Sequence, residues 1–141
     1  MLLDMYKTML SIRAFETKAA ECFTKGMLAG NIHLCIGQEA VPTGACYALE
    51  PEDYMTSTHR GHGHCIAKGA SLDKMLAELF GKKTGYCQGK GGSMHIADVA
   101  GLHSLGANGI VGAGIPIAAG SALVSKIKGD KHVTLCFFGD S

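Results

Sequence analysis

The sequence lacks an excess of charge of either sign and a long apolar run. Its 13 basic and 12 acidic residues nearly balance, so charge predicts no nucleic-acid surface. Its longest apolar stretches fall far short of the ~20 residues that span a bilayer. The start, MLLDMYKTML, carries an acid at Asp4 and no long apolar segment. We therefore expect neither a signal peptide nor a membrane segment.

Close cysteine pairs are also missing. The six cysteines are spread along the chain, which fits neither a zinc ribbon nor a disulfide framework. They stand at positions 22, 35, 46, 65, 87 and 136. This distribution predicts a reducing, cytoplasmic location.

Several common catalytic motifs are absent as well. There is no phosphate-binding glycine-lysine-serine/threonine loop, no HExxH and no G-x-S-x-G. The segment GAGIPIAAG lacks the third glycine of a dinucleotide fingerprint, and it precedes the best strand instead of following it. NAD and ATP are therefore disfavoured as cofactors.

The apolar pattern predicts a single α/β domain. Hydrophobic residues make up 47% of the 141 positions, enough for a core, and no repeat or linker divides the chain. Residues 133–138 form an unbroken apolar run, which predicts a strand buried on both faces of a parallel sheet. A second strand is expected at 53–58, and the region 82–104 is expected to be loop. Helices are predicted at residues 3–25, 39–49, 71–80 and 115–126.

The segment HRGHGH, residues 59–64, is the densest polar cluster. Its glycines would let backbone N–H groups approach an anion, and Arg60 offers a planar fork of donors to phosphate oxygens. The alternative is a zinc site made by His59, His62 and His64, although no nearby cysteine or carboxylate completes that ligand set.

Two further polar positions are candidates for function. His33 lies just before the second predicted helix, where a histidine is either a hydrogen-bonded structural residue or a catalytic group. Gly139 and Asp140 follow the 133–138 strand, where ligands gather in open α/β sheets, so Asp140 could bind Mg²⁺. The alternative interpretation of Gly-Asp is a simple turn.

Five segments together resemble the α subunit of the thiamine-diphosphate-dependent E1 dehydrogenases. They are HLCIGQEA, TSTHRGHGHCIAKG, GKGGSMHIAD, GANGIVGAGIP and FFGD, and they cover essentially the whole chain in order. The family includes the pyruvate, branched-chain 2-oxo acid and acetoin dehydrogenases. Within it, HRGHGH and GANGIVGAG are most similar to the acetoin dehydrogenases, with the bacterial pyruvate dehydrogenases next.

The resemblance implies a fold, cofactors and partners. The chain would be the N-terminal part of a thiamine-diphosphate-binding domain, with helices around a parallel sheet. Its cofactors would be thiamine diphosphate and Mg²⁺. An E1 β subunit would complete an α2β2 heterotetramer, and a lipoyl-bearing E2 would accept the acyl group from a small-molecule substrate; no nucleic acid or membrane is expected.

The resemblance also implies residue roles. His33 matches the substrate-side catalytic histidine, and His59 and Arg60 match positions that touch the cofactor diphosphate. The first of these two positions is tyrosine in many pyruvate enzymes, so His59 is a departure. Gly109 and Val111 match backbone contacts to the aminopyrimidine.

The end of the sequence carries the remaining implied roles. Asp140 matches the first metal-binding acid of the family's GDG…N motif. Ser141 stands where the second glycine is usual, and its backbone N–H could still face a phosphate oxygen of the cofactor. The asparagine of that motif is absent from the sequence. We therefore expect the chain to be the N-terminal part of a longer subunit, and to be inactive alone.

Overall fold

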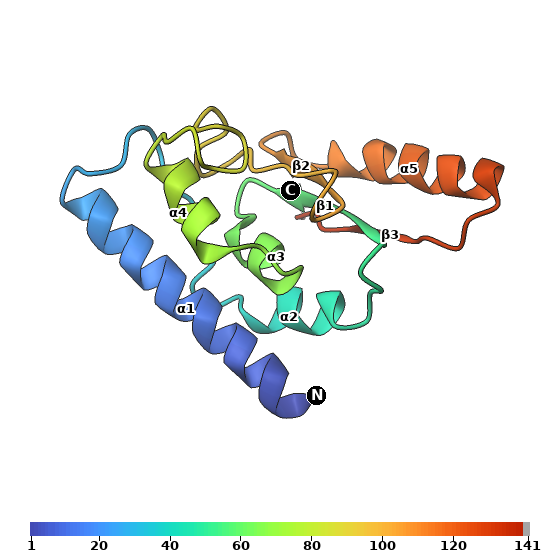
Figure 1. Cartoon of the computed structure of the whole chain (residues 1–141), viewed down its shortest axis with the longest axis horizontal. Coiled ribbons are helices and arrows are strands. Elements are labelled where there is room, and N and C mark those ends of the chain that lie inside the picture. The colour runs from blue at the N-terminus through green and yellow to red at the C-terminus, as the bar shows by residue number, and fades with distance from the viewer. Residues whose placement is uncertain (140–141) are drawn as a thin grey trace.

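A three-stranded parallel sheet lies at the centre of the structure, a computed structural model that describes residues 1–139 (Figure 1). The strands are β1 (Tyr54–Thr58), β2 (Ser104–Asn108) and β3 (Thr134–Cys136), in the order β2-β1-β3. Met55 is paired with Ser104 on one side and with Leu135 on the other. The predicted α/β class with a parallel sheet is confirmed.

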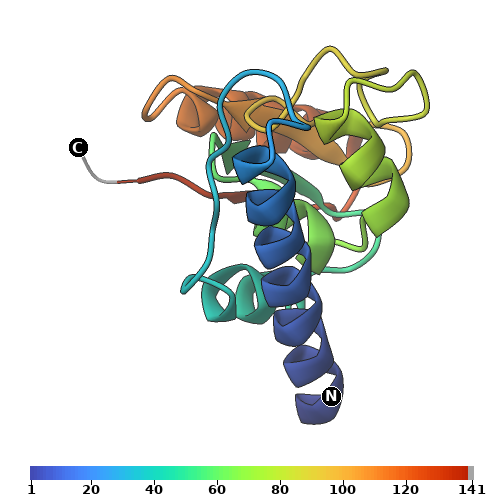
Figure 2. The ribbon, with the colours of Figure 1, turned by 90° about the vertical axis from the view of Figure 1, so that its left-hand side faces the viewer.

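Helices cover both faces of this sheet. Helix α5 lies along one face, and the other helices gather on the opposite side (Figures 1 and 2). The helices of the described residues are α1 (Leu2–Thr24), α2 (Ala40–Cys46), α3 (His62–Ala67), α4 (Leu72–Leu79) and α5 (Gly114–Lys128). Four of them match the predicted helices, with α2 ending earlier than expected.

The hydrophobic core lies between α1 and the short helix α3. Helix α1 buries Ile12, Phe15, Ala19 and Cys22, which recur at the three- and four-residue steps of one helix face. Gly63 lets α3 lie close to Cys35 and to Ile12 of α1, because an added Cβ there would be 2.7 Å from Cys35 Sγ and 3.4 Å from Ile12 Cγ2. This packing fixes the start of α3 just after the end of β1.

A buried carboxylate, Glu78 of α4, organises the glycine-rich segment that follows, residues 82–95. Its Oε2 accepts the backbone N–H groups of Cys87 and Gly89 at 2.8 and 2.9 Å. Its Oε1 accepts those of Gly91 and Gly92 at 2.7 and 3.0 Å. The segment is thus loop, as predicted, and one side chain accepts four of its backbone N–H groups.

Two predictions about the strands need correction. Residues 133–138 were expected to be buried on both faces, whereas β3 spans three residues and Val133 and Phe138 are 52% and 61% exposed. Within residues 1–139, β3 is an edge strand that pairs only with β1. The central strand is β1, whose Met55, Thr56 and Ser57 are buried.

Strand β2 and helix α3 were not predicted. The sequence of β2, SLGAN, carries few residues that favour strands, and it forms through pairing with β1. Helix α3, HGHCIA, was interpreted as part of a phosphate loop because of its glycine and histidines. In both cases tertiary contacts decide the conformation.

Helix α5 turns much of its apolar surface outward. Its buried residues are the small Gly114, Ala118 and Ser125, which lie toward the sheet. The exposed large residues of the helix are Ile115, Ile117, Leu123, Val124 and Ile127.

No helix among residues 1–139 combines the length and apolar character needed to cross a bilayer. All six cysteines have free thiols.

Candidate functional site

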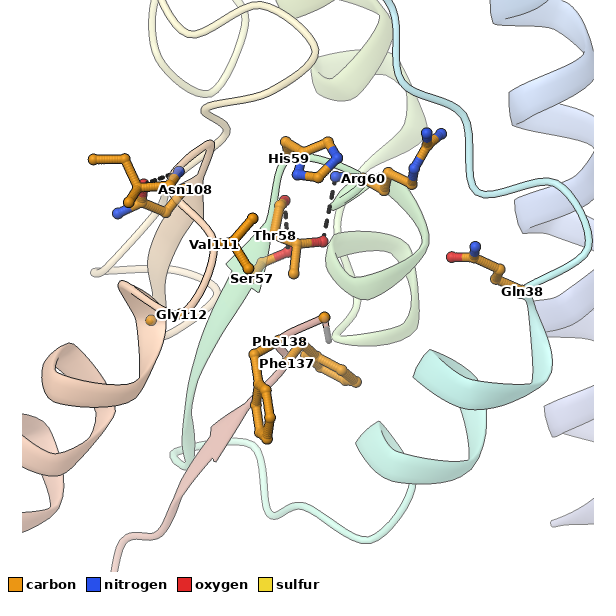
Figure 3. A pocket seen from close by; sticks show the side chains of 13 residues that line it. Gln38, Ser57, Thr58, His59, Arg60, Asn108, Val111, Gly112, Phe137 and Phe138 are labelled. Carbon is orange, nitrogen blue, oxygen red and sulfur yellow. Dashed lines mark hydrogen bonds between the residues drawn. The ribbon is translucent and has the colours of Figure 1, made fainter. Parts of the chain in front are cut away.

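A cavity of about 330 Å³ lies where the three parallel strands end (Figure 3). Since the strands run in the same direction, their carboxyl ends meet at one edge of the sheet, which is where ligands gather in open α/β folds. The cavity is lined by Gln38, Ser57, Thr58, His59, Arg60, Asn108, Ile110, Val111, Gly112, Gly114, Phe137, Phe138 and Gly139.

The end of β1 supplies His59 and Arg60, which both line the cavity; their predicted contacts to a diphosphate stay predictions. The Arg60 backbone N–H donates to Thr58 Oγ1 at 3.3 Å, which closes the turn after the strand. Its Nη1 donates to the carbonyl of Leu34 at 2.9 Å. Arg60 therefore joins β1 to the segment that carries His33. This bond uses one of the five N–H donors of the guanidinium.

The loop after β2 forms a second wall. Asn108 Oδ1 accepts the N–H of Ile110 at 2.8 Å, a turn that begins immediately at the strand end. Gly112 has a φ of 77°, which glycine adopts without strain. Val111 lines the cavity, whereas Gly109 lies in the same loop without lining it; the aminopyrimidine contacts predicted for both stay predictions.

The end of β3 supplies the apolar wall, Phe137 and Phe138. Phe137 stacks on His64, with ring centroids 3.8 Å apart and an interplanar angle of 7°. His64 Nδ1 lies 2.7 Å from Ser57 Oγ, and burial lowers the pKa of this histidine to about 4. His64 is therefore a neutral packing group near pH 7.

Gly139 also lines the cavity, but Asp140 and Ser141 lie outside the described residues. The predicted metal-binding role of Asp140 and the phosphate-facing role of Ser141 therefore stay predictions.

His33 stands beside the cavity wall. Its ring meets the ring of His59 edge to face, with centroids 5.1 Å apart. Burial, together with the nearby His59 and Arg60, lowers the pKa of His33. Its Nδ1 is buried and has no hydrogen-bond partner within residues 1–139. The imidazole is thus a neutral group with an unused polar atom, next to a residue that lines the cavity.

The three histidines of HRGHGH do not converge, so the zinc alternative finds no support. His62 is fully buried, with Nδ1 3.0 Å from Glu16 Oε1 and Nε2 3.0 Å from Ser93 Oγ. Among residues 1–139 no group of three or more His, Cys, Asp or Glu side chains is placed to hold a metal ion.

The glycines of HRGHGH have a packing role, while their predicted approach to an anion stays a prediction. A Cβ on Gly61 would lie 2.5 Å from Ser57 Oγ, so this glycine allows α3 to pack against β1. Sequence reasoning also missed Gln38, Asn108 and the two phenylalanines as cavity residues. Asn108 had one detectable signal, an Asx-Gly pair ahead of a glycine-rich run.

With the cavity at the strand ends flanked by His33, His59 and Arg60, comparison with known proteins defines the class. The sequence model of the family "Dehydrogenase E1 component" matches residues 6–141. The chain belongs to this family of oxidoreductase components.

Within this family, the chain is similar to α subunits of two kinds, which differ in their identity to it. The chain is 61% identical over 136 residues to the α subunit of acetoin:2,6-dichlorophenolindophenol oxidoreductase of Bacillus subtilis (strain 168), covering 96% of this chain and 40% of the relative. The Cupriavidus necator protein of the same name is 49% identical over 139 residues, covering 99% and 41%. The pyruvate dehydrogenase E1 component subunit α of Rhizobium meliloti is 42% identical over 138 residues, covering 98% and 39%. The chain spans about 40% of the length of these relatives.

Proposed function

We propose that this chain belongs to the α subunit of a thiamine-diphosphate-dependent E1 dehydrogenase that oxidatively cleaves acetoin and passes the acyl group to a lipoyl-bearing E2. The observation that carries the proposal is the cavity at the strand ends, where His59, Arg60 and Val111 stand at the positions that the family resemblance gives to cofactor contacts. The higher identity to acetoin oxidoreductase subunits supports acetoin over pyruvate. A pyruvate dehydrogenase E1 α subunit is the second candidate, supported by 42% identity.

The residues of the cavity suit thiamine diphosphate. One part is apolar, with Ile110, Val111 and Phe138 offering surface for aromatic rings. The other part is polar and includes Arg60 among its lining residues, a residue type that suits an anion. The buried Nδ1 of His33, which has no hydrogen-bond partner within residues 1–139, belongs to a ring that lies against His59 of the cavity wall. A volume of about 330 Å³ is within the range of small-molecule sites.

A Mg²⁺ ion would need oxygen ligands that the described cavity residues only partly supply. The lining residues up to Gly139 include no carboxylate. The proposal of a bound Mg²⁺ therefore rests on Asp140, the acid of FFGD, together with oxygens of the diphosphate.

The chain's own residues would position and stabilise. Thiamine diphosphate, when bound, supplies carbanion chemistry at a carbonyl carbon and an electron sink. Arg60 would hold the diphosphate. Phe137 and Phe138 would exclude water from the apolar part of the cavity. His33, kept neutral at pH 7 by its lowered pKa, would accept or donate a proton on the substrate side.

An E1 β subunit is the proposed partner, in an α2β2 heterotetramer. The apolar residues that α5 turns outward, such as Leu123 and Ile127, support burial against further protein. The loop after β2 adds Ile110 and Val111, which are 73% and 59% exposed. Assembly would thus cover both α5 and the open side of the cofactor cavity.

The test is to assay the full-length subunit with its β partner, thiamine diphosphate and Mg²⁺. Acetoin and pyruvate are compared as substrates, with 2,6-dichlorophenolindophenol as electron acceptor. We expect cofactor-dependent reduction of the dye with a higher kcat/KM for acetoin. Preference for pyruvate would support the second candidate, and no cofactor dependence with either substrate would contradict the proposed function.

A further inference from the structure

A buried chain of hydrogen bonds ends at the backbone of His33. Glu16 Oε1 lies 3.0 Å from His62 Nδ1, and His62 Nε2 lies 3.0 Å from Ser93 Oγ. The same Ser93 Oγ accepts the backbone N–H of His33 at 3.1 Å. Glu16 and His62 are completely buried, and Ser93 is 7% exposed. Three elements distant in sequence, α1, α3 and the glycine-rich segment, thus meet behind one backbone amide.

Counting donors and acceptors assigns the protons in this chain. The N–H of His33 can only donate, so Ser93 Oγ accepts it; in the neutral tautomer of His62 that carries its proton on Nδ1, Nε2 accepts the hydrogen of the Ser93 hydroxyl. His62 Nδ1–H then donates to the Glu16 carboxylate. The thiol of Cys35 donates to Glu16 Oε1 at 3.1 Å. Glu16 therefore holds residue 35 directly and residue 33 through two side chains.

This carboxylate–imidazole–hydroxyl arrangement is not a nucleophilic site. The hollow beside Ser93 has a volume of about 10 Å³, roughly the space of one water and too small for a substrate. The Ser93 hydroxyl is also occupied on both sides, by His62 and by the amide of His33. Its function must be exerted through the groups that it holds.

The segment that it holds carries two site contacts. The ring of His33 lies against His59, and the carbonyl of Leu34 accepts Nη1 of Arg60 at 2.9 Å. A shift of this backbone would therefore displace the His33 imidazole and release one anchor of the Arg60 guanidinium.

We propose that Glu16, His62 and Ser93 form a positioning relay that fixes the backbone at His33 and Leu34 and so places the His33 imidazole and the Arg60 guanidinium beside the cavity. The roles of those two residues rest on the proposed function. The relay itself is a structural claim that hydrogen exchange can measure separately.

The test compares Ser93→Ala and Ser93→Thr in the full-length subunit assembled with its β partner. Hydrogen exchange is followed in a peptide covering residues 32–35, and turnover is measured with acetoin and 2,6-dichlorophenolindophenol. For Ser93→Ala we expect faster exchange at this peptide and a ten- to hundredfold loss of turnover, roughly the cost of misplacing a catalytic group. Ser93→Thr keeps the hydroxyl and should retain most protection and turnover.

Two further variants complete the design. Ser104→Ala is the matched control, because Ser104 is also fully buried but its Oγ has no hydrogen-bond partner within residues 1–139. It should change neither readout. Should Ser93→Ala fail to fold, His62→Phe keeps a buried ring without either nitrogen, and the same two losses are expected.

The outcomes separate the two claims. Unchanged exchange at residues 32–35 in the variants would overturn the relay, whatever the activity. Faster exchange with full turnover would overturn its role in positioning. An unaltered complex inactive with acetoin and with pyruvate would refute the proposed function, while the exchange data would still decide whether the relay holds the backbone.

Discussion

Removing the Glu78 carboxylate should loosen the whole glycine-rich segment that follows α4. Four backbone N–H groups donate to its two oxygens, two to each. At ~1.5–3 kcal/mol per hydrogen bond to a charged group, a rigid loop would lose about 6–12 kcal/mol. The freed N–H groups can bind water once the segment opens, so we expect Glu78→Ala to cost about 3–5 kcal/mol, a large part of a typical total of ~5–15.

Glu78→Gln provides a sharper form of the same prediction. Glutamine keeps one accepting oxygen but places an NH₂ group against the two N–H donors of the other pair, so two hydrogen bonds become donor–donor contacts. We expect a loss of at least about 2 kcal/mol although the two side chains have nearly the same shape. Urea unfolding of the full-length subunit measures the free energy, and hydrogen exchange at residues 85–92 locates the change.

The matched control is Glu21→Gln on the exposed face of α1. Glu21 pairs with Lys18 at 3.0 Å at the surface, where solvent screening leaves an ion pair little effect on stability. If Glu78→Gln were as mild as Glu21→Gln, the carboxylate would not organise the segment and the reasoning would be refuted.

Three other predictions concern stability. Burial lowers the pKa of His64 to about 4, so between pH ~6.5 and ~4 the unfolded chain binds a proton that the folded chain does not. Stability should therefore fall by up to ~3 kcal/mol as the pH is lowered through that interval, and His64→Phe should flatten the Tm-against-pH curve there. The hydrogen bond from Arg13 lowers the pKa of Glu39 to about 2, so its contribution, complete above pH ~4.5, should disappear as pH falls toward 2, and Glu39→Gln should abolish this part of the acid unfolding curve. Gly63→Ala should destabilise by about 1–3 kcal/mol in urea unfolding despite alanine's higher helix propensity, because its Cβ would lie 2.7 Å from Cys35 Sγ; a stabilised variant would show that α3 has room.

The sequence predicted the elements whose pattern is periodic and local. Helices α1 and α4 follow their apolar spacing, and Ser71 caps α4 by accepting the N–H of Lys74 at 3.4 Å. Strand β1 was predicted from β-branched and aromatic residues. These features depend on a few neighbouring residues, which is why they can be read without the fold.

Elements that form through distant contacts could not be read in this way. The strand β2 has few strand-favouring residues and is defined by its pairing with β1, which lies 49 positions earlier at the pair Met55 and Ser104. The burial of residues 133–138 was overestimated because an apolar run does not reveal whether a strand has neighbours on both sides.

The candidate site divides along the same line. His59, Arg60 and Val111 were predicted to contact a ligand, and the structure places them at one cavity. Glu16, His62 and Ser93, which are hydrogen-bonded in that order and end at the backbone N–H of His33, could not be found as a group, because nothing local joins positions 16, 62 and 93. The packing of α1, α3 and the glycine-rich segment against one another brings these three side chains together.

The central claim is that the cavity at the strand ends binds thiamine diphosphate through Arg60. The most direct measurement is a calorimetric titration of thiamine diphosphate with Mg²⁺ into the full-length subunit with its β partner, unaltered and as Arg60→Lys. Lysine keeps the charge but cannot hold the Leu34 carbonyl and an anion with one planar fork. The account predicts saturable binding that is at least about tenfold weaker in the variant, a difference of ~1.4 kcal/mol, with the Tm of the cofactor-free protein nearly unchanged. Equal affinity in the two proteins would contradict it.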